Sequence, residues 1–77
     1  MSMRKPIEIR DRFLAARNHA MAAHEKYRQC QTERTLQTAI TWYFAAAKLA
    51  RRAGNAKSAK TLQTMAERLD LLLQTIR

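Results

Sequence analysis

The chain is poor in the residues that interrupt or cross-link a fold. Its 77 residues include one glycine, one proline and one cysteine. A single cysteine, Cys30, excludes an internal disulfide, and a single glycine, Gly54, excludes the glycine-rich loops that cradle phosphates. The longest apolar run, residues 42–47, is far shorter than the ~20 residues that span a bilayer. These absences exclude a disulfide scaffold, a P-loop nucleotide site and a transmembrane helix.

Acidic residues are also scarce, since 15 lysines and arginines stand against 6 acids and give a formal net charge of +9. No acid occurs between Arg34 and Ala66. Such a positive field attracts phosphate backbones or acidic protein surfaces. We expect a protein partner with an acidic surface, and we treat nucleic acid as possible. Neither membrane binding nor a small-molecule substrate is expected.

Three stretches carry apolar residues at alternating spacings of four and three, which is the period of a packed α-helix. The phase breaks after Cys30, and Gly54-Asn55 supplies a helix stop followed by a helix start. The three series are Ile9, Phe13, Ala16, Ala20, Ala23, Tyr27 and Cys30; Leu36, Ile40, Tyr43, Ala47 and Ala50; and Ala59, Leu62, Ala66, Leu69, Leu73 and Ile76.

This pattern predicts an all-α fold, a small antiparallel three-helix bundle. Helices are expected at about residues 6–29, 33–53 and 56–76 of a single domain, after a disordered N-terminus at residues 1–5. The alternative is a dimerising helical hairpin with the first two helices continuous, because no glycine or proline stands between Cys30 and Thr35. Cys30 ends the first apolar series, so we expect a buried thiol in a cytoplasmic protein.

Surplus apolar residues indicate a contact with a partner. Trp42, Tyr43 and Phe44 are consecutive and point in three directions, of which a three-helix monomer can bury two well. Leu71 stands among further leucines that cannot all face one groove. We therefore expect Trp42, Phe44 and Leu71 to bind a partner. A domain of this size buries only ~60% of its surface on folding, which also favours a homodimer.

Basic residues around the turn between the second and third helices form a candidate anion or nucleic-acid site. The residues 49–54 resemble the opening of a helix-turn-helix DNA-binding motif, although Asn55, Lys60 and Gln63 stand where that motif has apolar residues. Free amides at the start of the third helix would add to the site. No aromatic residue interleaves with these bases to stack nucleotides. The candidate residues are Arg34, Lys48, Arg51, Arg52, Asn55, Lys57 and Lys60.

No residue set for catalysis, metal or cofactor binding is present. His19 and His24 are five residues apart, so they do not share one helical ridge, and Glu25 points about 100° away from its neighbour His24. We predict a non-enzymatic helical protein–protein interaction module, a small regulator or inhibitor that docks on a macromolecular partner. The alternative function is nucleic-acid binding through the basic turn.

Overall fold

The computed structural model describes residues 6–77, with side chains from Ile9 onward, and shows three helices. They are α1 (Pro6–Gln29), α2 (Glu33–Arg52) and α3 (Ala56–Ile76), and no strand occurs among these residues. The all-α three-helix bundle is thereby confirmed. The disorder expected for residues 1–5 falls outside the described part of the chain.

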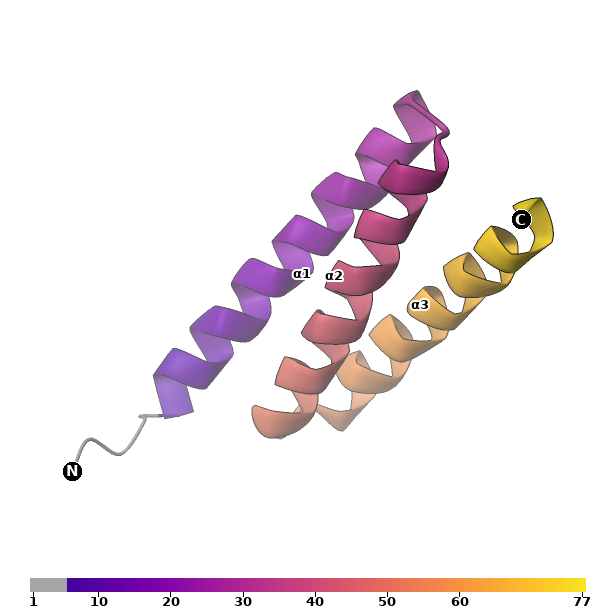
Figure 1. The fold of residues 1–77 in the computed structure, drawn as a ribbon. Helices are drawn as coiled ribbons and strands as arrows, with labels where there is room; N and C mark the ends of the chain where they lie inside the picture. Colours follow the sequence, from indigo (N-terminus) through magenta and orange to yellow (C-terminus); the bar gives the residue numbers. More distant parts are fainter. Residues whose placement is uncertain (1–5) are drawn as a thin grey trace.

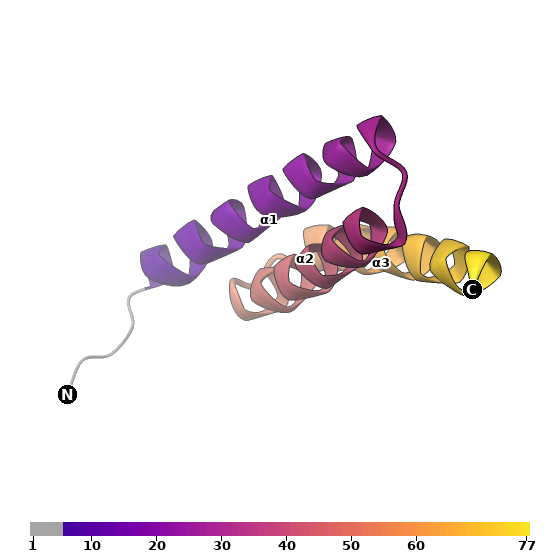
Figure 2. The same cartoon turned by 45° about the horizontal axis from the view of Figure 1, so that its top comes forward.

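The bundle is open, with α2 at its centre (Figure 1). Helices α1 and α3 both pack along α2 and run antiparallel to it, whereas their backbones make no close approach to each other within residues 6–77. Figure 2 shows α1 and α3 diverging from each other. The molecule is accordingly elongated, with extents of 46 × 19 × 19 Å. Because α1 and α3 each contact one neighbour, each leaves one side without a helical partner.

A capped turn separates α1 from α2. The Thr32 hydroxyl accepts a hydrogen bond from the backbone N–H of Thr35 at 3.2 Å, and the Thr35 hydroxyl donates to the carbonyl of Cys30 at 2.7 Å. These bonds satisfy groups left unpaired at the two helix ends. The alternative of one continuous helix is therefore wrong. The expected burial of Cys30 is also wrong: its side chain is exposed, because the chain leaves the helical path at this residue.

The turn between α2 and α3 depends on Gly54, which has a φ of 78°. Helix α2 ends at Arg52, one residue earlier than expected, because Ala53 serves as its C-cap. The Asn55 side chain then accepts from the backbone N–H of Ser58 at 3.1 Å and caps α3. The hairpin therefore combines a left-handed glycine with an asparagine N-cap.

Gly54→Ala is expected to destabilise the protein by about 1–2 kcal/mol, because a β-carbon is strained in the left-handed region. Apart from Gly54 and its two neighbours in the chain, no atom lies within 4 Å of the added carbon, so the cost is confined to the local backbone. Urea unfolding followed by circular dichroism measures it. The control Gly54→Asn should cost less, since asparagine tolerates this conformation. Equal stability of Gly54→Ala and the natural protein would contradict the expectation.

The core is rich in alanine between α1 and α2 and rich in leucine on α3. Ala20 of α1 and Ala39 and Ala46 of α2 are fully enclosed, which lets the two helix backbones approach closely. The second apolar series is buried throughout, while Ile76 at the end of the third is 54% exposed. The buried core residues are Phe13, Ala16, Ala20, Leu36, Ala39, Ile40, Tyr43, Ala46, Ala47, Ala50, Ala59, Leu62, Ala66, Leu69 and Leu73.

Candidate macromolecule-binding surfaces

The described residues contain no enclosed polar site. Among residues 9–77, no charged side chain is buried and no group of three potential metal ligands comes together. Their ion pairs are superficial: Glu25 with Arg28 at 3.7 Å and Glu33 with Arg77 at 2.9 Å. Any binding function of this part of the chain must therefore use its surface.

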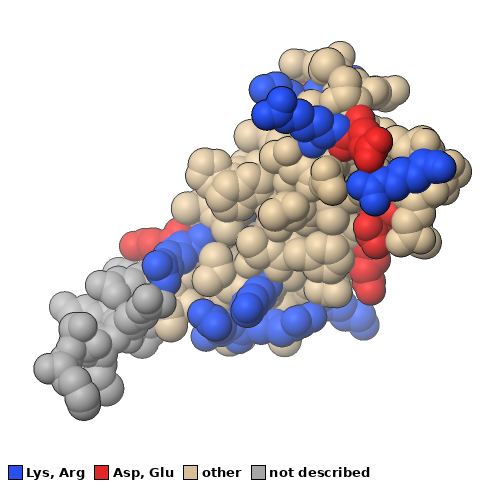
Figure 3. Space-filling model, in the orientation of Figure 1, with Lys and Arg blue, Asp and Glu red and all other residues tan. Residues whose placement is uncertain are grey.

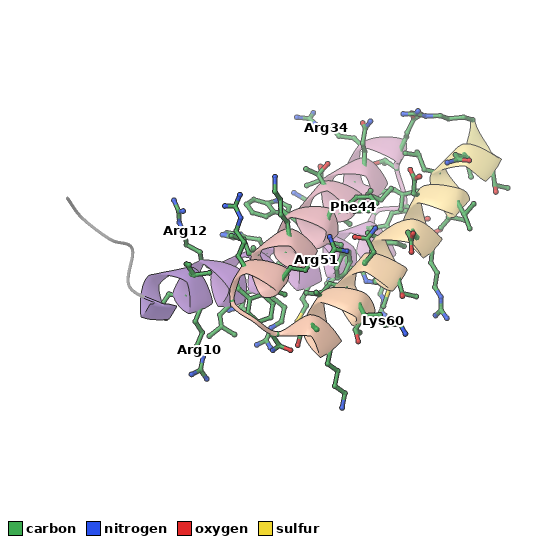
Figure 4. The ribbon with its side chains drawn as sticks, turned by 90° about the horizontal axis from the view of Figure 1, so that it is seen from below. Arg10, Arg12, Arg34, Phe44, Arg51 and Lys60 are labelled. Carbon is green, nitrogen blue, oxygen red and sulfur yellow. The ribbon has the colours of Figure 1, made fainter. Side chains whose placement is uncertain are left out.

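One side of α2 points away from both neighbouring helices, and we call it the outer face. At about 100° per residue, it consists of Arg34, Thr38, Thr41, Ala45, Lys48 and Arg52. All of these are exposed except the half-buried Ala45. Figure 3 views this side: its centre is uncharged, and basic side chains gather around the end of α2 that leads into α3. Figure 4 shows Arg34 and Arg12 extending to this same side, whereas Arg10 extends to the opposite one.

The two exposed aromatic side chains border the outer face. Trp42 lies on its α1 side and is 36% exposed, and its ring stacks on His19 with the centroids 4.5 Å apart. Phe44 lies on the opposite border, next to α3, and is 38% exposed. The middle aromatic, Tyr43, is buried. The helical period therefore places Trp42 and Phe44 on either side of the outer face.

The basic residues predicted to bind anions fall into two groups. Arg34 stands near the start of α2, about 21 Å along the helix from Lys48 at 1.5 Å per residue. Close to Arg34, a hollow of about 460 Å³ is lined by Ala23, Lys26, Arg34, Thr35 and Thr38. Neither Lys26 nor Arg34 belongs to an ion pair among the described side chains. Lys26 was not singled out from the sequence, since only the packing of α1 on α2 brings it to Arg34.

The second group surrounds the α2–α3 turn. Arg51 donates to the Gln63 side chain at 3.5 Å, and a hollow beside them also contains Glu67. The amide of Ser58 is already bonded to Asn55, so one of the donors expected to receive an anion is occupied. The remaining members, Lys57 and Lys60 among them, are exposed. This group is a solvated basic end without a built pocket for a single anion.

The opposite side of the molecule, which we call the reverse face, carries exposed apolar side chains beside arginines of α1. By helical position it carries Leu14 and Met21 of α1 and Met65, Leu72 and Ile76 of α3. Met21 is 57% exposed, Leu72 39% and Ile76 54%. The spacing of seven between Leu14 and Met21 is the feature of the sequence that indicates they share one side of α1. Leu71, at 63% the most exposed of the large apolar residues described, points away from α2 and belongs to neither face.

A partly buried polar pair, His24 of α1 and Tyr43 of α2, links these two helices. The Nδ1 atom of His24 lies 2.8 Å from the Tyr43 hydroxyl, and the two rings meet edge to face. Burial lowers the pKa of His24, and Arg28 lowers it further while Glu25 opposes them. Burial likewise raises the pKa of Tyr43. Both shifts favour the neutral pair, in which the Tyr43 hydroxyl can donate to Nδ1.

The lowered pKa of His24 predicts that stability falls on mild acidification. Because the unfolded chain binds a proton more readily, the stability due to His24 is fully present above its ordinary pKa of 6.5 and is lost as pH falls through the lower folded value. Thermal melts between about pH 8 and 5 should show a decreasing Tm. The variant His24→Gln should show a flatter profile over this range, and identical profiles would contradict the assignment to His24.

No known protein family, characterised protein or solved structure shows significant similarity to this chain. Among the described residues, none of the helices combines the length and apolar character needed to cross a bilayer. The class that the fold defines is a small all-α protein, an open three-helix bundle.

Proposed function

We propose that the chain is a non-enzymatic docking module, a small regulator or inhibitor that binds an acidic amphipathic helix of a protein partner on the reverse face. The observation that carries this proposal is the exposure of Met21, Leu72 and Ile76 on the uncovered sides of α1 and α3. Exposed large apolar side chains of this kind are characteristic of protein interfaces. A helix laid between α1 and α3 would give each of them the second neighbour that it lacks.

The charge beside the apolar residues defines the partner. On α1, Arg10, Arg17 and Arg28 follow the helix side next to Leu14 and Met21, and the acid near them, Glu25, is paired with Arg28. Acidic residues flanking the apolar stripe of a partner helix would therefore meet these arginines on binding. This charge complementarity favours the complex and raises the association rate constant. The exposed free thiol of Cys30 fits a reducing compartment, and we propose a cytoplasmic protein.

A designed amphipathic helix with a leucine stripe and glutamate flanks tests this function by calorimetry. We expect binding at a 1:1 ratio that weakens with added salt. Leu72→Lys should weaken it at least tenfold. Leu71→Lys is the matched control, because Leu71 is as apolar and more exposed but lies off the reverse face. Equal losses in the two variants would refute the proposal.

A second copy of the chain is the other candidate occupant of the reverse face. We propose such a homodimer as the state of the free protein at high salt. The +9 charge and the arginines of each copy would repel those of the other. Light scattering should therefore show self-association that increases with salt, whereas binding of the acidic helix decreases. A protein that stays monomeric at every salt concentration would contradict the proposed homodimer.

Nucleic-acid binding is the second candidate function. The specific observation that favours it is the outer face, where Arg34, Lys48 and Arg52 share one exposed stripe without an acid and with aromatic rings at both borders. If four to six phosphates are engaged, the logarithm of affinity should fall with that of salt at a slope of roughly −3 to −5. Lys48→Glu with Arg52→Glu should weaken this binding and leave the acidic helix bound to the reverse face.

A further inference from the structure

We propose that the seam between α1 and α2, which borders the outer face, binds a single strand of nucleic acid. The seam consists of Arg12, His19 and Lys26 of α1 and Arg34 and Trp42 of α2. One base of the strand stacks against Trp42, and one backbone phosphate lies between Lys26 and Arg34. This inference rests on the second candidate function and names its ligand. It places the binding centre near the start of α2, at the opposite end of this helix from the basic α2–α3 turn that the sequence indicates.

The phosphate position is the hollow near the start of α2. Lys26 of α1 and Arg34 of α2 line this hollow from two helices. Neither cation forms an ion pair with an acidic side chain among the described residues. The Thr38 hydroxyl in the same hollow donates to the carbonyl of Arg34 at 2.9 Å. The two cationic groups can therefore close on one phosphate, as pairs of basic side chains do at nucleic-acid backbones.

The base position lies one helical turn further along α2. Thr38 and Trp42 are four residues apart, so they are neighbours on the helix surface, and a turn advances about 5.4 Å. A base is joined to its phosphate through one sugar, which spans a separation of this order. His19 holds the Trp42 ring by stacking at an interplanar angle of 24°, so the indole is oriented before a ligand arrives.

The seam continues beyond the aromatic pair to another cation. Arg12, His19 and Lys26 are spaced by seven residues on one side of α1, and Figure 4 places Arg12 on the same side as Arg34. The order along the seam is thus cation, stacked ring, cation. A strand lying along it would set phosphates on both sides of a stacked base, a pattern typical of single-strand binding surfaces. A free mononucleotide would leave Arg12 without a phosphate.

Trp42 is the only tryptophan of the chain, so its fluorescence reports directly on the seam. Titration with a short oligothymidylate at about 50 mM salt should quench it, whereas thymidine monophosphate should quench it only at far higher concentration. A duplex of the same length should bind without comparable quenching. Saturating oligothymidylate without quenching would overturn the inference, as would equal quenching by polyglutamate, which would indicate an acidic protein segment as the ligand.

Variants separate the seam from the rest of the basic surface in anisotropy titrations with labelled oligothymidylate. Trp42→Leu should weaken binding about 5- to 150-fold. This factor corresponds to the affinity contributed by one base stacked on an aromatic ring. Lys26→Gln with Arg34→Gln should make the salt slope shallower by about 0.7, corresponding to the one single-strand phosphate that the two cations share. Melting curves confirm that each variant is folded.

The charge-matched control is Lys57→Gln with Lys60→Gln, which removes the same charge near the α2–α3 turn. It should retain the quenching of Trp42 and lose less affinity than the seam pair. If the control loses as much affinity as the seam pair, the seam inference fails while nucleic-acid binding stands. If the natural protein binds no oligonucleotide, the second candidate function fails as well.

Discussion

Leu36→Ala should destabilise the protein by about 2–5 kcal/mol, the range for removing a fully buried leucine from a core. Leu36 is completely enclosed and is the largest fully buried side chain among the described residues. It lies in the first turn of α2, the helix on which both others pack. A domain of this length has a total free energy of unfolding of about 4–12 kcal/mol. The substitution therefore removes a large part of it.

Urea unfolding followed by far-ultraviolet circular dichroism measures this loss. The matched control is Leu71→Ala, which deletes the same atoms from a side chain that is 63% exposed. We expect the control to change stability by less than about 0.5 kcal/mol, as is usual for surface substitutions. If both variants unfolded at the same urea concentration, the packing of α2 described above would be wrong.

Ala20→Leu should have the second large effect, because overpacking should lower the free energy of unfolding by about 1–3 kcal/mol or more. Ala20 is fully enclosed, and α2 presents the enclosed alanines Ala39 and Ala46 in the same core. A leucine at residue 20 has no space unless α1 moves away from α2. Because His19 is the adjacent residue and stacks on Trp42, the movement should also change the fluorescence of Trp42.

Ala22→Leu is the control for this substitution, since Ala22 is exposed on the same helix. Alanine and leucine both favour helix, so the control changes helix propensity as much as Ala20→Leu does. We expect the control to retain both the stability and the tryptophan fluorescence of the natural protein. A stable Ala20→Leu variant with unchanged fluorescence would show that α1 and α2 are not in close contact at this position.

The two types of surface have different physical consequences. The reverse face carries exposed apolar side chains beside arginines, so its affinity for a protein helix combines burial with moderate salt dependence. The outer face is polar and basic with two rings at its borders, so strand binding there depends more steeply on salt. Salt titrations on variants of either face can therefore assign each binding activity to its own side of the molecule.

The three helices could be read from the sequence because their signals are local. An apolar residue every three or four positions specifies a packed helix, and the turns need Thr32, Gly54 and Asn55 close to where helices stop and start. The burial of Tyr43 between two exposed aromatics follows from the same period. The error at Cys30 has the same origin: periodicity holds only while the helix continues, and a three-residue turn breaks it.

The candidate surfaces depended on tertiary structure because they join residues from different helices. Helical period by itself shows that Lys26 and Arg34 are exposed, but only the antiparallel packing of α1 on α2 brings them to one hollow. Similarly, the sequence indicates spare apolar residues on α1 and α3 without showing that these helices stay apart. The spacing of apolar and polar residues along the chain determines where the helices form and which side of each is apolar. The packing of the helices determines which residues of different helices lie close together.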